Sequence, residues 1–380
     1  MRTLILSCST GGGHNSCAAA IKEIYDENEE YCTIKDVLGF ITEGTPEFFS
    51  RWHSNIYRYM PWLFSFGYGY CERHEWVFDD GSLVRRYFSR AVKNLYRFIH
   101  REKIDSVICT HIFAAFIVTD MKKRYGIRLK TAFVATDYAC HPGTGKAELD
   151  HWFIPHHKLT DEFADNEVPE TRMISTGIPV SQSFYRNIPK STAAKRMGVP
   201  QKRRHLVISC GSMGCGPIKK ILQLLTQYEQ DVFDISVVCG TNRKLYRYLK
   251  KEYRKAHNIH ILDYVKDMPL LLDSADLLLT KPGGITTTEA FAKRLPMVFI
   301  NAVVGCEEYN RRWFESMGAA VSADDAAQAA ELCVALMADK DRLHKMKNSI
   351  SQQSHHNAAE IIYHYMQLQG DAQNEEIHQA

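Results

Sequence analysis

The chain has 380 residues, of which 45% are hydrophobic and 24% charged, and its formal net charge is +3. This length exceeds what one hydrophobic core usually supports, so we expect two domains. The small net charge carries no overall signature of nucleic-acid binding, and no apolar run is long enough to cross a bilayer. The first residues do not follow the pattern of a signal peptide, which predicts a protein of the cytoplasm or of the inner face of a membrane.

Cysteine and histidine spacing argues against a metal site. The eleven cysteines are scattered without a Cys-x-x-Cys pair, a pattern typical of reduced thiols rather than of a disulfide framework or a zinc site. The pairs His156-His157 and His355-His356 lack the spacing of an HExxH motif. We therefore expect no bound metal.

The first half of the chain alternates between strand-like and helix-like segments. Thr3–Cys8 is a short apolar run, a glycine-rich turn reaches His14, and a helical pattern covers Asn15–Tyr25. Further strand-like runs are Thr33–Val37, Asp105–Thr110, Thr131–Thr136 and His151–Ile154. This alternation predicts βαβ units with a parallel sheet, whose ligands bind at the carboxyl ends of the strands.

The segment from Pro46 to His100 is rich in aromatic residues. Arginines are interleaved with them, namely Arg51, Arg58, Arg73, Arg85, Arg86 and Arg90. Aromatic and basic side chains on a largely helical segment suit an interface with anionic lipid, and they suit stacking on nucleic acid equally well. Aromatic residues at helical spacing are also common core residues. We expect a mixture, with some rings inside and a few exposed.

The second half repeats the α/β pattern. Pro179–Arg204 is rich in Pro, Ser, Lys and Arg, which indicates a linker. Strand-like runs then begin at His205, which leads into a glycine loop, and continue at Asp234–Cys239, Ile259–Leu262, Leu277–Thr280 and Met297–Ile300. We therefore predict domains at 1–185 and 200–349, with a disordered polar tail at 369–380.

The stretch Asp276–Glu289 contains the most informative turn. An apolar strand runs into Pro-Gly-Gly and then into the start of a helix. Backbone N–H groups and the positive end of the helix dipole make such a turn an anion site, and Gly283 and Gly284 let a diphosphate approach closely. Glu289 is placed to accept both hydroxyls of a ribose. Thr286-x-x-Glu289 also matches an ordinary capping box, and this alternative stays open.

His14 follows the first glycine-rich turn, at the expected start of a helix. The turn matches neither the Walker sequence nor the dinucleotide fingerprint. The helix dipole disfavours an imidazolium at this place, which leaves a neutral imidazole able to accept a proton. His14 therefore suits a general base for an acceptor hydroxyl, and the alternative is a cap or turn residue.

Six blocks of sequence follow one another along the chain: STGGGHNS from Ser9, ATDYACH from Ala135, TGIP from Thr176, VCGTN from Val238, TKPGGITTTE from Thr280 and GCEEYN from Gly305. In this order they resemble the diacylglycerol glycosyltransferases. This family includes bacterial processive diacylglycerol glucosyltransferases and plant monogalactosyldiacylglycerol synthases, and is related to the transferase that adds N-acetylglucosamine to lipid-linked muramyl-pentapeptide. The similarity runs from about residue 3 to 366 and is most specific at 276–318.

The resemblance implies an α/β protein of the GT-B fold, with two Rossmann-like domains facing a central cleft. It implies a C-terminal helix at about 350–368 that packs back on the first domain. The implied activity is metal-independent, inverting transfer of a hexose from a UDP-sugar to the hydroxyl of diacylglycerol, with no cofactor. Whether successive sugars are added stays open. The implied place is an anionic membrane surface on the inner face of the cell membrane, without nucleic acid as a partner.

The resemblance also assigns residues to the site. It makes His14 and Asp137 the catalytic pair and places Gly12, Gly13 and His141 on the acceptor or lipid side. It assigns Gly283, Gly284 and Thr286 to the diphosphate, Glu289 to the ribose, and Glu307 with Asn310 to the sugar hydroxyls. It places further UDP-sugar contacts at Gly211, Ser212, Gly240, Asn242 and Val265, the last three at the uracil end.

Two departures from the family pattern leave open which sugar is transferred and which acceptor receives it. Cys306 stands where the family often has glutamine, which removes an amide beside the sugar. Pro142-Gly-Thr-Gly replaces an aromatic residue that commonly follows the histidine of the Thr-Asp block. Three alternatives therefore remain: a soluble glycosyltransferase with another acceptor, a non-catalytic UDP-sugar sensor, and a hydrolysing sugar epimerase.

Overall fold

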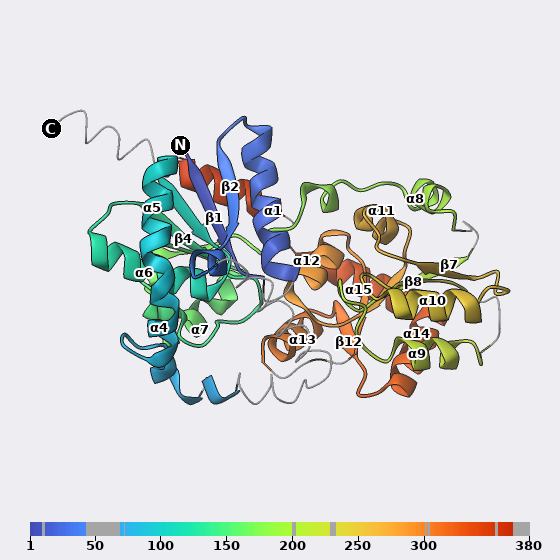
Figure 1. Cartoon of the computed structure of the whole chain (residues 1–380). Helices are drawn as coiled ribbons and strands as arrows, with labels where there is room; N and C mark the ends of the chain where they lie inside the picture. The colour runs from blue at the N-terminus through green and yellow to red at the C-terminus, as the bar shows by residue number, and fades with distance from the viewer. Residues whose placement is uncertain are drawn as a thin grey trace. The chain divides into compact units, whose positions relative to one another are not determined.

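The computed structural model describes residues 1–9, 12–42, 69–71, 73–199, 203–228, 233–300, 302, 305–353 and 356–367. Residues 46–68 and 72 of the aromatic segment Pro46–His100, and the predicted tail at 369–380, lie outside these residues. The chain divides into two compact units (Figure 1). The first unit is Met1–Gln182 with Val304–Cys306 and His356–Ala380, and the second is Ser183–Val303 with Glu307–His355.

The first unit is built on a six-stranded parallel sheet in the order β2-β1-β3-β4-β5-β6. Its strands are β1 (Thr3–Ser7), β2 (Cys32–Asp36), β3 (Ser106–Cys109), β4 (Lys130–Val134), β5 (His151–Ile154) and β6 (Met173–Ser175). Its main helices are α1 (Gly12–Glu27), α4 (Leu83–Phe88), α5 (Val92–Glu102), α6 (Ile112–Tyr125) and α7 (Thr160–Asp165). The central strands β1 and β3 are buried on both faces, as expected for a parallel sheet covered by helices.

The second unit repeats this plan with a parallel sheet in the order β12-β11-β10-β7-β8-β9. Its strands are β7 (Arg204–Ser209), β8 (Phe233–Val238), β9 (Ile259–Leu262), β10 (Leu277–Thr280), β11 (Met297–Phe299) and β12 (Ala320–Ser322). Its helices are α8 (Lys190–Met197), α9 (Ile218–Leu225), α10 (Arg243–Glu252), α11 (Met268–Asp273), α12 (Gly284–Ala292), α13 (Cys306–Ser316), α14 (Ala326–Ala338) and α15 (Lys340–Ser351). The predicted α/β class with two Rossmann-like domains is confirmed.

The predicted linker contains a helix. Within Pro179–Arg204, α8 buries Ala193 and Ala194 and packs against α11. Lys190, its first residue, forms an ion pair with Asp276. The stretch is therefore not a linker throughout. It contains an amphipathic helix of the second unit, which its largely polar composition did not indicate.

The C-terminal helix is shorter than predicted. The expected single helix at about 350–368 corresponds to the end of α15, at Ser351, and to a separate helix at 358–367. The latter packs on the first unit, where the rings of Tyr363 and Tyr25 lie 4.9 Å apart in an edge-to-face arrangement. Lys130 at the start of β4 donates from Nζ to the carbonyl of Tyr365, 3.2 Å away.

The described part of the aromatic segment contains both buried and exposed rings. Phe78 and Phe88 are buried, whereas the exposed fraction of Trp76 is 59%. Among the interleaved arginines, Arg85 lies inside, because only 2% of its side chain is exposed and it pairs with Asp80 and Asp120. In the described part of the chain, no helix has both the length and the hydropathy needed to span a membrane.

In each sheet the strand order reverses beside the first strand of the unit. β1 has β2 on one side and β3 on the other, and β7 has β8 and β10. Ligands of open parallel sheets bind outside the carboxyl ends of the strands at such a point. The predicted glycine-rich turns follow β1, β7 and β10. The residues at these three strand ends are therefore the candidate ligand-binding residues.

Candidate active site

His14 is held at the reversal point of the first sheet by residues that follow two other strands. It is the third residue of α1, and its Nδ1 lies 2.7 Å from the carbonyl oxygen of Thr110, after β3. The hydroxyl of Thr136, after β4, lies 3.1 Å from the same nitrogen. Because a carbonyl can only accept, Nδ1 carries the proton in the neutral ring and Nε2 carries the lone pair. His14 is thus oriented as a proton acceptor through Nε2.

A second imidazole lies beside His14. The ring centroids of His14 and His111 are 4.5 Å apart at an interplanar angle of 76°. His111 is the N-cap of α6, where its Nδ1 accepts a hydrogen bond of 3.1 Å from the backbone N–H of Phe113. Its Nε2 therefore carries the proton in the neutral ring, so the lone pair of His111 is already engaged.

Asp137 and His141 follow β4 at the same edge of the sheet. Asp137 is partly exposed and directly follows Thr136. Burial lowers the pKa of His141, whose Nδ1 lies 2.7 Å from the carbonyl of Pro142. At Gly143 a Cβ atom would lie 2.5 Å from the ring of Phe78. The segment that departs from the family pattern is therefore packed beneath this aromatic ring.

Two glycine loops of the second unit are packed against each other. Gly240 has a φ of +57°, and a Cβ atom there would lie 2.2 Å from the carbonyl oxygen of Ser212. The backbone N–H of Thr241 donates to that same oxygen at 2.8 Å. Gly211, with a φ of +73°, begins the turn after β7. Glycine at position 240 is thus required both by its conformation and by the close approach of the neighbouring loop.

Replacing Gly240 by alanine should destabilise the protein far more than replacing Gly198. Both glycines have positive φ, but no atom lies within 4 Å of a Cβ at Gly198. We expect Gly198→Ala to cost about 1–2 kcal/mol for the left-handed backbone, and Gly240→Ala about 2–5 kcal/mol because overpacking is added. Urea denaturation of the two variants measures the difference. Equal urea midpoints for the two variants would show that the two loops can move apart without a loss in the free energy of unfolding.

Asn242 joins these loops rather than presenting a free amide. Its Oδ1 accepts from the backbone N–H of Leu245 at 3.0 Å as the N-cap of α10. Its Nδ2 donates to the carbonyl of Gly214 at 3.2 Å. Val265 lies in the loop after β9 and is partly exposed. The assignment of Gly240, Asn242 and Val265 to the uracil end stays a prediction, and the structure adds that Asn242 supports the shape of the loops.

The Pro-Gly-Gly turn leads directly into a helix. Gly283 is the N-cap of α12 and no side chain caps this helix, so Thr286 and Glu289 both lie within it. The capping-box alternative is therefore wrong. Most of the helix is buried, including Thr287 and Thr288, but Gly283, Thr286 and Glu289 are partly exposed. At a spacing of three residues these positions share one face of the helix and form an accessible stripe from its N-terminus.

Glu289 occupies an unusual environment for a carboxylate. Among the residues that the structure describes, its side chain has no hydrogen-bond or ion-pair partner. Loss of water around the carboxyl raises its pKa from 4.5 to about 8. A carboxylate without a partner is costly to keep in such surroundings, and a ligand that donates hydrogen bonds would relieve this cost. Strongly raised pKa values of this kind are common at functional sites.

Two side chains of α13 support the turn. Glu307 pairs with Lys281, with Oε1 and Nζ 3.1 Å apart, and both side chains are largely buried. A Cβ atom at Gly283 would lie 4.0 Å from the same Oε1, so the Glu307 carboxylate lies beside the turn. Asn310 is fully buried, and its Nδ2 donates to the carbonyl of Pro282 at 3.0 Å. Asn310 thus fixes the turn from within, while Glu307 lies next to the stripe on α12.

Comparison with known proteins supports the resemblance to the diacylglycerol glycosyltransferases. Residues 14–180 match the family model described as monogalactosyldiacylglycerol (MGDG) synthase, and residues 218–353 match glycosyl transferases group 1. The chain is 26% identical over 354 residues to a processive diacylglycerol beta-glucosyltransferase of Staphylococcus carnosus (strain TM300), covering 91% of this chain and 87% of that protein. It is also 26% identical over 372 residues to the Bacillus subtilis (strain 168) protein of the same name, covering 95% and 93%. These matches bear out the resemblance to the diacylglycerol glycosyltransferases.

Solved structures support the GT-B fold of the chain. The structure of Acinetobacter baumannii MurG matches 96% of this chain and 98% of its own, with a TM-score of 0.60 at 15% identity. The structure of UDP-GlcNAc 2-epimerase from Neisseria meningitidis, bound to UDP-GlcNAc, matches 96% and 99% with a TM-score of 0.61 at 13% identity. At these identities the likeness concerns the fold alone.

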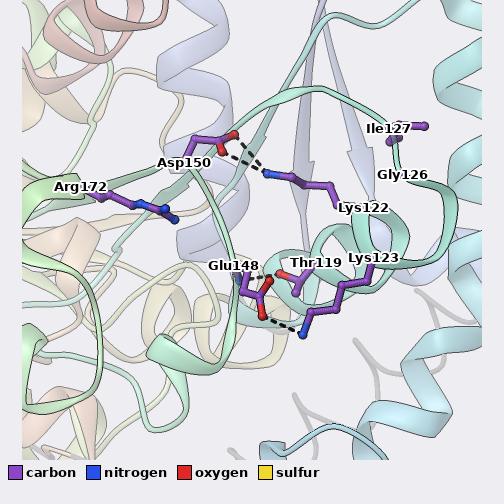
Figure 2. Close-up of a pocket in the computed structure, with 8 residues that line it drawn as sticks. All are labelled: Thr119, Lys122, Lys123, Gly126, Ile127, Glu148, Asp150 and Arg172. Carbon is purple, nitrogen blue, oxygen red and sulfur yellow. Dashed lines mark hydrogen bonds and ion pairs between the residues drawn. The ribbon is translucent and has the colours of Figure 1, made fainter.

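The first unit has a cavity of about 430 Å³ at the other end of its sheet (Figure 2). Its lining residues are Thr119, Lys122, Lys123, Gly126, Ile127, Glu148, Asp150 and Arg172. Figure 2 shows Lys122 directed at Asp150 and Lys123 at Glu148, with 3.1 Å and 2.8 Å between the charged atoms. Asp150 and Arg172 precede β5 and β6, so this cavity lies at the amino ends of the strands, away from His14.

The sequence patterns did not single out Thr110, His111 or Lys281. Each of them directly follows a strand or lies one residue beyond it, which is the position where α/β sheets place ligand-binding residues. Their position directly after β3 and β10 could have indicated these residues from the sequence. The contact between Thr110 and His14 joins residues 96 positions apart, so it could be predicted only once the order of the strands in the sheet was known.

Proposed function

We propose that this glycosyltransferase transfers a hexose from a UDP-sugar to the hydroxyl of diacylglycerol at the inner face of the cell membrane. The transfer inverts the anomeric centre and uses neither a metal ion nor another cofactor. The observation that carries this proposal is the orientation of His14, whose Nδ1 faces the Thr110 carbonyl 2.7 Å away. The names of the curated relatives support diacylglycerol as the acceptor and glucose as the first sugar to test.

In this mechanism His14 is the general base. Nε2 takes the proton of the acceptor hydroxyl as the oxygen attacks the anomeric carbon. The imidazolium that forms keeps its Nδ1–H directed at the Thr110 carbonyl, which stabilises the positive charge. Asp137, after β4, is positioned at the same edge of the sheet to act on the acceptor side together with Gly12, Gly13 and His141.

The turn at Gly283 and Gly284 stabilises the departing UDP. Negative charge grows on the diphosphate as the bond to the sugar breaks, and the N–H groups at the start of α12 together with its dipole offset this charge. Thr286 lies on the same accessible stripe, Glu289 accepts the ribose hydroxyls, and Glu307 accepts the hydroxyls of the sugar. Because fixed dipoles supply the stabilisation, this mechanism requires no metal ion.

A radiolabelled transfer assay tests the proposal. The purified protein is incubated with liposomes of diacylglycerol and anionic lipid, and with UDP-glucose or UDP-galactose in parallel, each with and without EDTA. We expect label in the organic phase with one of the donors, unchanged by EDTA. Label that stays aqueous while the donor is consumed without an acceptor would indicate hydrolysis. UDP binding without any turnover would favour a non-catalytic sensor.

Acceptor choice is tested separately by liposome flotation. We expect the protein to float with liposomes that contain anionic lipid, and transfer to rise with the fraction of that lipid. A protein that remains wholly aqueous and transfers hexose to a water-soluble alcohol would favour a soluble glycosyltransferase with another acceptor. The departures at Cys306 and at residues 142–145 motivate this arm of the experiment.

A further inference from the structure

We propose that His111 is a positioning residue that holds the ring of His14 in its reactive orientation. This inference rests on His14 being the general base of the proposed function. It assigns to His111 a role in the reaction separate from its role as a helix cap. The two roles use different parts of the side chain, since the cap uses Nδ1 and the contact with His14 uses the ring.

Four rings form a continuous column that ends at His14. Phe88 of α4 stacks on Phe113 of α6, with centroids 4.2 Å apart. Phe113 lies 4.7 Å from His111, and His111 lies 4.5 Å from His14. Phe88 is buried, so the far end of the column is anchored in the core of the first unit. We call Phe88, Phe113, His111 and His14 the ring column.

The ring column fixes the remaining freedom of the His14 side chain. The Thr110 carbonyl and the Thr136 hydroxyl hold Nδ1 at 2.7 Å and 3.1 Å, and the remaining motion of the ring is a small rotation about its Cβ–Cγ bond. The edge-to-face contact with His111, at 76°, restricts this rotation and so fixes the direction in which Nε2 points. Because proton transfer depends steeply on the alignment of the reacting atoms, a histidine whose ring rotates accepts the proton more slowly.

His111 itself is held firmly enough to serve this purpose. Its Nδ1 accepts from Phe113 N–H at 3.1 Å, and it begins the 14-residue helix α6. That helix is largely buried against the sheet. The cap and the stack on Phe113 together set the plane of the His111 ring, which then sets the plane of the His14 ring.

Two substitutions separate the ring from the cap. Asparagine is a good N-cap residue, so His111→Asn keeps the cap acceptor and removes the ring. His111→Phe keeps a ring against His14 and removes the cap acceptor. We expect His111→Asn to lower kcat about 3–10-fold, with the KM for UDP-glucose within about twofold and an unchanged Tm. We expect His111→Phe to lower Tm by about 2–4 °C while kcat stays within about twofold.

A purely structural role would give the opposite pattern. If kcat follows Tm across the two variants, or if His111→Asn keeps the full kcat, the inference is wrong. The rates are measured with UDP-glucose and diacylglycerol liposomes, or with UDP-galactose if that is the donor used.

A double-mutant cycle shows whether His111 acts through His14. In a His14→Ala background, His111→Asn should cause no further decrease in kcat, because the ring that it positions is absent. A further 3–10-fold decrease, roughly the size expected for the single variant, would mean that His111 acts directly on substrate and would overturn the inference. Failure of the proposed base gives a different result, in which His14→Ala alone retains the wild-type rate.

Discussion

His14→Ala is expected to lower the turnover number about 10²–10⁴-fold while leaving the affinity for UDP unchanged. The size of the effect follows from the loss of general-base catalysis. His111 is no substitute, because its Nδ1 already accepts from the Phe113 N–H. Initial rates of label transfer measure the turnover, and isothermal titration with UDP measures the affinity.

His157→Ala is the matched control for this experiment. His157 is exposed and lies after β5 in the same unit, so the substitution removes an imidazole without touching the Thr110 carbonyl or the ring column. We expect its turnover to equal that of the wild type. A His14→Ala variant with comparable turnover would remove His14 from the mechanism and leave it a turn residue.

Most of the fold could be predicted from the sequence because parallel strands buried on both faces stand out as apolar runs between polar turns. The two strands that were missed, Met173–Ser175 and Ala320–Ser322, are sheet edges of three residues each and are only partly buried. The helix α8 was also missed, because only Ala193 and Ala194 of its residues are buried. Edge elements carry little hydrophobic signal, and composition alone then indicates a loop.

The part of the candidate site that lies within one local segment of the chain could be predicted from the sequence. The Pro-Gly-Gly turn and Glu289 lie within a single strand-turn-helix unit, so the sequence placed them correctly on the first turns of α12. The capping box was wrong because the helix begins at Gly284, two residues before Thr286. A helix start shifted by one or two positions changes which side chains are caps, and sequence patterns seldom resolve such a shift.

Contacts between distant segments could not be predicted. The hydrogen bond between Asn242 and the Gly214 carbonyl, and the one between Asn310 and the Pro282 carbonyl, each join segments 28 residues apart. Both asparagines look like ligand-binding residues in the sequence because they carry amides at strand or helix ends. In the structure their amides satisfy backbone carbonyls, which every buried turn requires. Asn310 therefore contributes to the site through the turn that it holds.

Glu289→Ala is expected to weaken UDP binding by about 1–3 kcal/mol, the cost of losing a charge-assisted hydrogen bond. A role limited to the helix would lower the melting temperature and leave the affinity unchanged. Glu331→Gln, on the exposed face of α14 in the same unit, is the control and should alter neither quantity. Titration calorimetry with UDP gives the affinity, and thermal unfolding gives the stability.

The raised pKa of Glu289 predicts a pH dependence of UDP binding. With a pKa of about 8 in the unliganded protein, most molecules carry a neutral carboxyl at pH 7, whereas the ribose hydroxyls require an acceptor. Affinity should therefore rise about tenfold per pH unit up to about pH 8 and then level off, by linkage between binding and proton release. Glu289→Gln should abolish this rise. A wild-type affinity that changes with pH in parallel with the glutamine variant would show that the ribose does not contact Glu289.

The same carboxyl should make the unliganded protein less stable as the pH rises. Burial raises the pKa of Glu289 in the folded state from 4.5 to about 8, so between these values the unfolded chain releases a proton that the folded chain keeps. The stability that Glu289 contributes is complete below about pH 4.5 and is lost as the pH rises through 8. Glu289→Gln should therefore have the higher Tm at pH 8.5, and the two curves should converge near pH 5. Because UDP restores a partner to the carboxylate, saturating UDP should raise the Tm of the wild type more than that of the variant at pH 8.5.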